Sequence, residues 1–261
     1  MNARSALFDL YGDHLRQRGG RAPVAALVRL LAPLGVAPPA VRTAVSRMVR
    51  QGWLEPVRLP GGPGYALTDR AVRRLDDSAA RIYRTAAPEW DGTWHLAVTS
   101  LPAERAKRDR LRAGMTFLGL AQLDDSTWLG PRWSAEIDAL LEVEGVPAER
   151  FVARHEGNSL ELVRRAWDVE ELGRFYASWL DAAQLLVSGA GPAANEEQAF
   201  ATRSLLVHEW RKFLFLDPGL PRRLLPEDWP GVRAAEFFDT QSERLRPAAT
   251  RFVERTLTGA P

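Results

Sequence analysis

Apolar side chains recur with a helical period along residues 39–54 of the chain. They fall on one face of the predicted helix: Val41, Val45, Met48 and Val49. Pro39 suits the first turn of this helix, where a missing N–H costs nothing. The opposite face carries guanidinium groups and short hydroxyls and no acid: Arg42, Thr43, Ser46, Arg47 and Arg50. Such a face is typical either of an ordinary solvated helix or of a helix that reads a DNA major groove.

Two helices and a hairpin are expected to flank this stretch. Ser5 is predicted to cap a first helix that stops at Gly19-Gly20, and Pro23 is predicted to open a second helix that Pro33 ends. Residues 53–59 and 65–68 read as two strands joined by a turn over residues 60–64. Three helices and such a hairpin predict a winged helix-turn-helix, whose wing follows the phosphate backbone with Arg58 as its best contact.

The rest of the chain divides into a mixed segment and a helical segment. Residues 69–85 are expected to form a connecting helix, and residues 86–88 to mark a boundary. The segment that follows predicts the order β-α-β-β-α-β of a ferredoxin-like domain, from 93–101, 103–113, 115–123, 126–132, 134–144 and 150–155. The last segment predicts long helices at 170–187, 196–216 and 229–256, the last as one helix or two. The expected fold class is therefore α+β, with domains at 1–85, 86–165 and 166–261.

The charge is unevenly distributed between these segments. Residues 1–85 hold fourteen arginines and six acidic residues, a net charge of +8, whereas the remainder holds twenty-one basic and twenty-seven acidic residues, a net charge of −6. A basic N-terminal segment joined to an acidic remainder indicates that the N-terminal segment binds a polyanion such as DNA.

Composition argues against several other classes of protein. The chain has no cysteine, which excludes disulfides, thiol nucleophiles and Cys-type zinc sites, and its four histidines are scattered. No metal and no cofactor is expected. No apolar run approaches the length of a membrane span, and no signal peptide is recognisable, so a cytoplasmic protein without a membrane partner is expected. Serine-nucleophile, P-loop and dinucleotide motifs are absent from the sequence, so we expect no enzyme.

Two alternatives stay open at this point. A ferredoxin-like domain is also the pattern of small CRISPR-associated nucleases, in which case Asp91, Asp109, Asp124 or Asp125 would bind a divalent metal. The chain could also be a DNA-binding dimer that no ligand regulates. Binding of a small-molecule effector would separate the last possibility from a ligand-controlled regulator.

Several stretches resemble the PaaX family of bacterial repressors of phenylacetate-degradation operons. These are YGDHLRQRGG, VRTAVSRMVRQGWL, RIY with WDGTWHL, AWDVEELGRFY and, as the most specific, residues 205–231. The resemblance covers nearly the whole chain. It implies the three domains named above and a homodimer that leaves its operator when an aryl-acetyl-CoA thioester such as phenylacetyl-CoA binds. The family's basic wing is replaced here by LPGGPGYAL, in which Tyr65 is kept, so DNA contact is expected to rest mainly on the helix of Arg47.

The charged run His208-Glu209-Trp210-Arg211 lies within an apolar helix, and charged groups in such surroundings need partners. One interpretation is an effector pocket with cations at its mouth and aromatic walls; the other is a buried Arg–Glu pair that joins helices. The candidate effector residues are Trp167, Tyr176, Trp179, Arg203, His208, Arg211 and Trp229.

Overall fold

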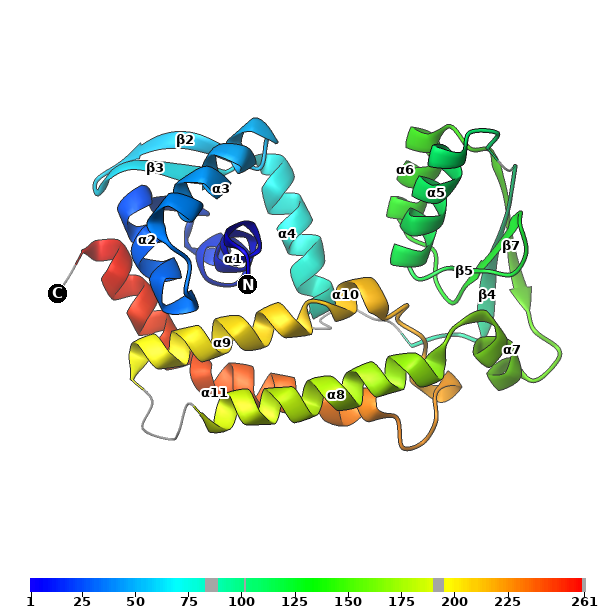
Figure 1. Cartoon of the computed structure of the whole chain (residues 1–261). Helices are drawn as coiled ribbons and strands as arrows, with labels where there is room; N and C mark the ends of the chain where they lie inside the picture. The colour runs from blue at the N-terminus through cyan, green and yellow to red at the C-terminus, as the bar shows by residue number, and fades with distance from the viewer. Residues whose placement is uncertain (83–88, 101, 190–194, 260–261) are drawn as a thin grey trace. The chain divides into compact units, whose positions relative to one another are not determined.

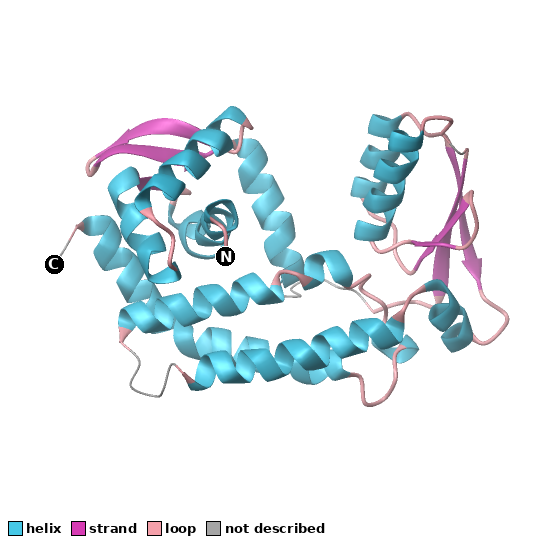
Figure 2. Ribbon diagram, in the orientation of Figure 1, coloured by secondary structure: helices cyan, strands magenta, loops and turns pink. Residues whose placement is uncertain are grey.

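The computed structural model of the chain describes residues 1–82, 89–100, 102–189 and 195–259. The boundary expected at residues 86–88 lies outside them. Helices predominate, and two small sheets complete a mixed α and β protein (Figure 2).

The chain forms two compact units, each assembled from separate parts of the sequence. Their bounds are Met1–Ala86, Ser178–Lys212 and Val232–Pro261 for unit 1, and Ala87–Ala177 and Phe213–Gly231 for unit 2. Helices α8 (Val169–Ser188) and α11 (Pro230–Thr258) therefore contribute residues to both units.

The first helix of unit 1 is longer and less regular than its sequence indicates. Helix α1 (Ala3–Asp9) continues through a π-helical segment, Leu10–Leu15, and a 3₁₀ turn to Gly19, whose positive φ of 81° ends it as expected. The predicted cap at Ser5 is wrong, because the side chain of Asn2 accepts the Ser5 N–H at 2.9 Å and the helix begins one turn earlier.

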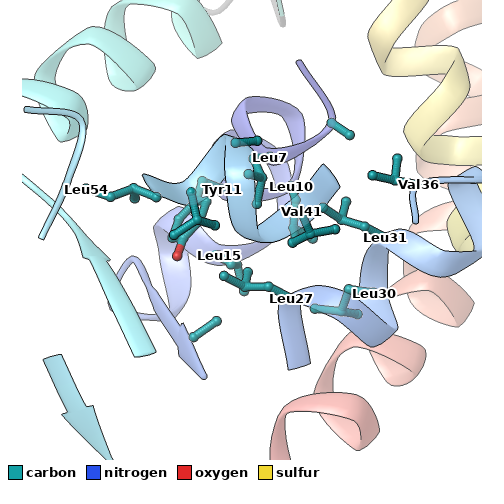
Figure 3. Packing of buried hydrophobic residues seen from close by; sticks show 14 of the residues in the cluster. Leu7, Leu10, Tyr11, Leu15, Leu27, Leu30, Leu31, Val36, Val41 and Leu54 are labelled. Atoms are coloured by element: carbon teal, nitrogen blue, oxygen red, sulfur yellow. The ribbon is translucent and has the colours of Figure 1, made fainter. Parts of the chain in front are cut away.

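Helices α2 (Val24–Leu31) and α3 (Pro38–Arg50) follow as the apolar pattern predicts (Figure 1). Pro38 and Pro39 occupy the first turn of α3. Val41, Val45 and Met48 are buried, and Val49 packs against the same core. Figure 3 shows Leu7, Leu10 and Tyr11 of the first helix gathered with Val41 and with residues of α2 in this core.

The hairpin of unit 1 is tighter than predicted. Strand β2 (Leu54–Leu59) pairs with β3 (Gly62–Leu67) so that Leu59 lies opposite Gly62, which leaves a two-residue turn in place of the five expected. The short strand β1 (Arg21–Pro23), which the sequence analysis missed, pairs with β3 and places it at the centre of the sheet. A Cβ on Gly64 would lie 2.6 Å from the Ala22 carbonyl oxygen, so only glycine lets these strands approach.

The C-terminal helices complete the core of unit 1. Helix α4 (Asp69–Ile82) follows the hairpin as expected, and α9 (Glu196–Trp210) and the second part of α11 belong to the same unit. Four buried apolar residues of α9 and α11 join the core of the first three helices: Phe200, Ala249, Phe252 and Val253.

Unit 2 contains the mixed segment in the predicted order β-α-β-β-α-β. Its elements are β4 (Thr93–Thr99), α5 (Arg105–Phe117), β5 (Ala121–Gln122), β6 (Thr127–Gly130), α6 (Ala135–Glu144) and β7 (Ala148–Arg154). The strands form an antiparallel sheet in the order β5-β6-β4-β7, and Ala97 and Trp128 pack on Leu111, Met115, Ile137 and Leu141 of the two helices. Residues 115–117, predicted to open a strand, instead finish α5.

Two further differences concern the helical segment. Helix α7 (Ser159–Ala166) was missed, although Asn158 caps it by accepting the N–H groups of Leu160 and Glu161. The helix predicted over residues 196–216 is interrupted after Trp210 and resumes as α10 (Phe213–Leu216). At the interruption Arg211 forms an ion pair with Asp9, and two residues later the ring of Phe213 stacks on that of Tyr176.

Candidate DNA-binding face and its ionic support

The polar face of α3 is exposed along its whole length. All five candidate residues lie on the surface: Arg42, Thr43, Ser46, Arg47 and Arg50. The apolar residues between them, Ala44, Val45 and Met48, are buried, and Val49 is partly buried. The helix contains no acidic residue, and no ion pair is found for its three arginines among the residues that the structure describes. The face therefore offers three guanidinium groups and two hydroxyls to a polyanion.

The two hairpin candidates differ in their surroundings. Arg58 is exposed on β2 opposite Pro63. Tyr65 is half-buried on β3, and its carbonyl oxygen accepts the hydroxyl of Tyr11 at 3.0 Å. Burial raises the pKa of the Tyr11 hydroxyl, which thus stays protonated and keeps the hairpin bonded to the first helix. Arg58 is the hairpin side chain that is available to a phosphate.

The charged run of α9 finds its partner at the opposite end of the sequence. Arg211 Nη1 lies 2.6 Å from Asp9 Oδ1, and His208 Nδ1 lies 2.7 Å from Asp9 Oδ2. The Asp9 side chain is 4% exposed, whereas those of His208 and Arg211 are 15% and 24% exposed. Glu209 pairs with Lys212 at the surface instead. The partner of Arg211 is therefore an aspartate of α1, and not the glutamate that the sequence interpretation offered.

A second carboxylate, Asp13, repeats this arrangement one turn further on. It forms an ion pair with Arg203, whose Nε also donates to the Ser242 carbonyl oxygen of α11 at 3.0 Å. Burial lowers the pKa of Arg203 to about 10, which leaves it charged at neutral pH. His14 Nε2 lies 3.1 Å from the same carboxylate, and burial, with the Arg18 cation, lowers the pKa of His14 to about 3. Arg203 thus carries the charge that balances Asp13.

Asp9 and Asp13 were not among the candidate residues predicted from the sequence. The signal was present, since both acids interrupt the apolar run LFDLYGDHL four residues apart. A helix places residues four apart on one face, and buried carboxylates require cationic partners. Because charged groups in apolar surroundings need partners, the sequence around Asp9 and Asp13 indicates paired carboxylates in the same way as the run from His208 to Arg211 does.

The aromatic effector candidates pack against other rings within each unit. In unit 2, Trp167 stacks on Trp94, and Tyr176 stacks on Phe213 with ring centroids 3.9 Å apart and meets Trp229 edge to face. In unit 1, Trp179 packs against Trp210 and Phe238. Arg203, His208 and Arg211 belong to unit 1 and are engaged with aspartates. Three of the seven candidates thus belong to unit 2 and four to unit 1.

Three acids of the nuclease alternative, Asp91, Asp124 and Asp125, lie outside helices and strands, and Asp109 lies on α5. The Asp91 carboxylate accepts the N–H and hydroxyl of Thr93, and Asp124 accepts the N–H groups of Ser126 and Thr127; these bonds hold both pKa values below the ordinary range. Asp109 pairs with Arg105 at the surface. Across residues 1–82, 89–100, 102–189 and 195–259, no three histidine or acidic side chains are grouped as metal ligands are. In the same ranges no helix is both long and apolar enough to cross a membrane.

Comparison with known proteins identifies related chains along nearly the whole sequence. Three family models match: PaaX-like protein at residues 2–71, PaaX protein central Cas2-like domain at 87–162, and PaaX-like protein C-terminal domain at 167–255. The chain is 31% identical to the transcriptional repressor PaaX of Escherichia coli K12, over 97% of this chain and 83% of that protein. A solved structure, the uncharacterized protein Rv0674 from Mycobacterium tuberculosis, matches with a TM-score of 0.63 and 25% identity over 98% of both chains.

Proposed function

The chain belongs to the PaaX family, and on that premise we propose that it is a transcriptional repressor whose helix α3 reads operator DNA. The observation that carries the proposal is the exposed, acid-free face of α3 within a segment of net charge +8. Three helices followed by the β2–β3 hairpin support a winged helix-turn-helix for residues 1–85. The curated relative is itself named a repressor, which supports the same role and a cytoplasmic location.

We assign the candidates to two kinds of contact. Arg47, near the middle of the exposed face, is proposed to read a guanine, with Thr43 and Ser46 at neighbouring bases or phosphates. Arg42, Arg50 and Arg58 are proposed to hold phosphates. Tyr65 is proposed to act through the hairpin, because its backbone is bonded to Tyr11.

For the remaining segments we propose a ferredoxin-like middle domain over residues 86–165 and an effector-binding domain over residues 166–261. The strand order β5-β6-β4-β7 supports the first assignment, because it places the first strand of the segment between the third and the fourth. The molecule is proposed to act as a homodimer on an inverted repeat, with half-sites about one or more helical turns apart.

The proposed effector is an acyl-CoA thioester such as phenylacetyl-CoA. Trp167, Tyr176, Trp179 and Trp229 are the proposed aromatic contacts, and Arg203, His208 and Arg211 the proposed polar ones. An anionic effector that binds Arg211 must compete with Asp9, which already lies 2.6 Å from its guanidinium group. Such an effector acts by binding the DNA-free state more tightly than the DNA-bound state.

The test uses the full-length chain and a duplex selected by it from a random library. Arg47→Ala is expected to lose about 1–3 kcal/mol of affinity for the selected duplex, measured by fluorescence anisotropy, because one base contact is lost. Arg42→Ala and Arg50→Ala are expected to weaken binding to selected and random duplexes alike. Arg233→Ala, which removes one exposed charge from α11, is the matched control.

Failure of the parent chain to enrich any duplex would contradict the proposed function. Unchanged affinity of Arg47→Ala would contradict the assigned face alone. Phenylacetyl-CoA added to the preformed complex tests the effector: release of the duplex is expected, and retention at saturating ligand would reject this thioester.

A further inference from the structure

Helix α1 lies between the proposed DNA-reading helix and the C-terminal helix α9. It contacts both helices, and the 3₁₀ turn that precedes α3 also contacts α9 (Figure 1). On one side Leu7 and Leu10 join Val41 and Val45 of α3 in a fully buried core. On the other side Asp9 meets His208 and Arg211. Helix α1 thus links α3, which also contacts α2 and β2, to α9.

The contacts with α9 are directional, unlike the apolar contacts with α3. Asp9 Oδ2 is hydrogen-bonded to His208, and Asp13 accepts a hydrogen bond from Arg203, which also donates to the backbone of α11. Arg211 adds an ion pair at Asp9 Oδ1, outside hydrogen-bonding geometry. Apolar packing tolerates sliding more readily than charge-assisted bonds with fixed donor positions. The two carboxylates therefore determine the register of α1 along α9.

The part of the first helix that carries these bonds is also its irregular part. The π-helical segment Leu10–Leu15 begins immediately after Asp9 and contains Asp13. A π-helical segment inserts one residue into a helix and is found frequently at functional sites. The π-helical segment thus sets the rotation of Asp13 relative to Asp9 along the first helix.

We propose that Asp9 and Asp13 are positioning residues for operator recognition, which act on α3 through the register of α1 against α9. The inference rests on the proposed DNA-binding function and adds to it residues that touch no DNA. Their loss changes how well the face of α3 fits a specific sequence, while the charges that attract any duplex stay in place. A purely structural ion pair predicts something different, namely a change in thermal stability and equal effects on all DNA.

The deciding variant is Asp9→Asn in the full-length chain, because it keeps the size of the side chain and removes the charge that both partners share. We expect its affinity for the selected duplex to fall about 5- to 150-fold, the usual range for coupling between distinct sites. Affinity for a random duplex of the same length should stay within about twofold, since no DNA-facing cation is altered. Asp9→Glu, which keeps the charge, is expected to recover part of the loss.

Glu254→Gln is the matched control. It removes an ion pair with Arg18 that also joins the first helical segment to α11, but this pair lies at the surface, with Glu254 56% exposed. No change in either affinity is expected for the control.

Should Asp9→Asn fail to fold, Arg211→Gln supplies the same readout, because its side chain is partly exposed and His208 still holds Asp9. Equal affinity of parent and variant for the selected duplex would overturn the inference while leaving the proposed function intact. Parallel loss of both affinities with a lowered melting temperature would also overturn it. If the parent chain selects no duplex, the proposed function fails and the inference falls with it.

Discussion

His14 is buried with its ring against that of Phe200, at a centroid distance of 5.0 Å. Its lowered pKa, about 3, means that the folded chain keeps the ring neutral, whereas the unfolded chain protonates it near pH 6.5. The stabilisation is therefore fully present above pH 6.5 and is lost as the pH falls from 6.5 toward 3.

Replacing His14 tests this linkage. The free energy of unfolding of the parent chain is expected to fall by about 1 kcal/mol per pH unit between pH 6.5 and 4.5, since one unit of pKa difference corresponds to roughly 1.4 kcal/mol. His14→Gln is expected to flatten this dependence in urea titrations at several pH values. His155→Gln, at an exposed histidine, should leave the slope as it is. An unchanged slope for His14→Gln would show that its ring is protonated alike in both states.

At the scale of elements, the hairpin depends on the absence of a side chain at Gly64. A Cβ there would lie 2.6 Å from Ala22 O and 2.7 Å from Leu59 Cδ1, and one of these neighbours is backbone. Gly64→Ala is expected to lower the free energy of unfolding by about 1–3 kcal/mol through overpacking, measured by urea denaturation. Pro63→Ala, at the adjacent exposed position, is the comparison and should change it by less than about 1 kcal/mol. Equal stability of Gly64→Ala and the parent would mean that β1 does not approach β3 this closely.

The sequence predicted elements whose signal is local. Pro39 and the period of Val41, Val45 and Met48 identified α3, and alternation with turn residues identified the mixed segment of unit 2. The sequence did not predict β1, whose three residues are ordered by pairing with β3. It also did not predict the interruption of the helix after Trp210. Asp9 and Asp13 stand out in the sequence as acids within an apolar run, but their pairing with Arg211 and Arg203 was not predictable, because about 190 to 200 residues separate the partners and only folding brings them together.

At the scale of the whole molecule, unit 1 is built from both ends of the chain. Phe200 is fully buried, and with Phe252 and Val253 it packs in the core of the three N-terminal helices. A fragment of residues 1–86 keeps the +8 charge that favours DNA binding but loses these side chains, and each large apolar residue removed from a core costs about 3–5 kcal/mol.

The isolated fragment is therefore expected to be largely unfolded, and its DNA affinity to be weak, strongly salt-dependent and not specific for sequence. Circular dichroism melting and binding to selected and random duplexes measure both properties. Full-length Phe200→Ala, which removes only one of these side chains, should retain a cooperative but lowered transition. A cooperatively folded fragment with parental specificity would show that the C-terminal helices are dispensable for the DNA-binding fold.

The placement of Phe200, Ala249, Phe252 and Val253 also sets the order of events during synthesis. The ribosome releases the first three helices early, but the side chains that close their core emerge roughly ten to thirty seconds later at about 5–20 residues per second. During this interval the nascent chain exposes apolar surface that chaperones bind. A prematurely terminated product lacks these side chains, so we expect it to be too unstable to compete with the full-length chain for the proposed operator.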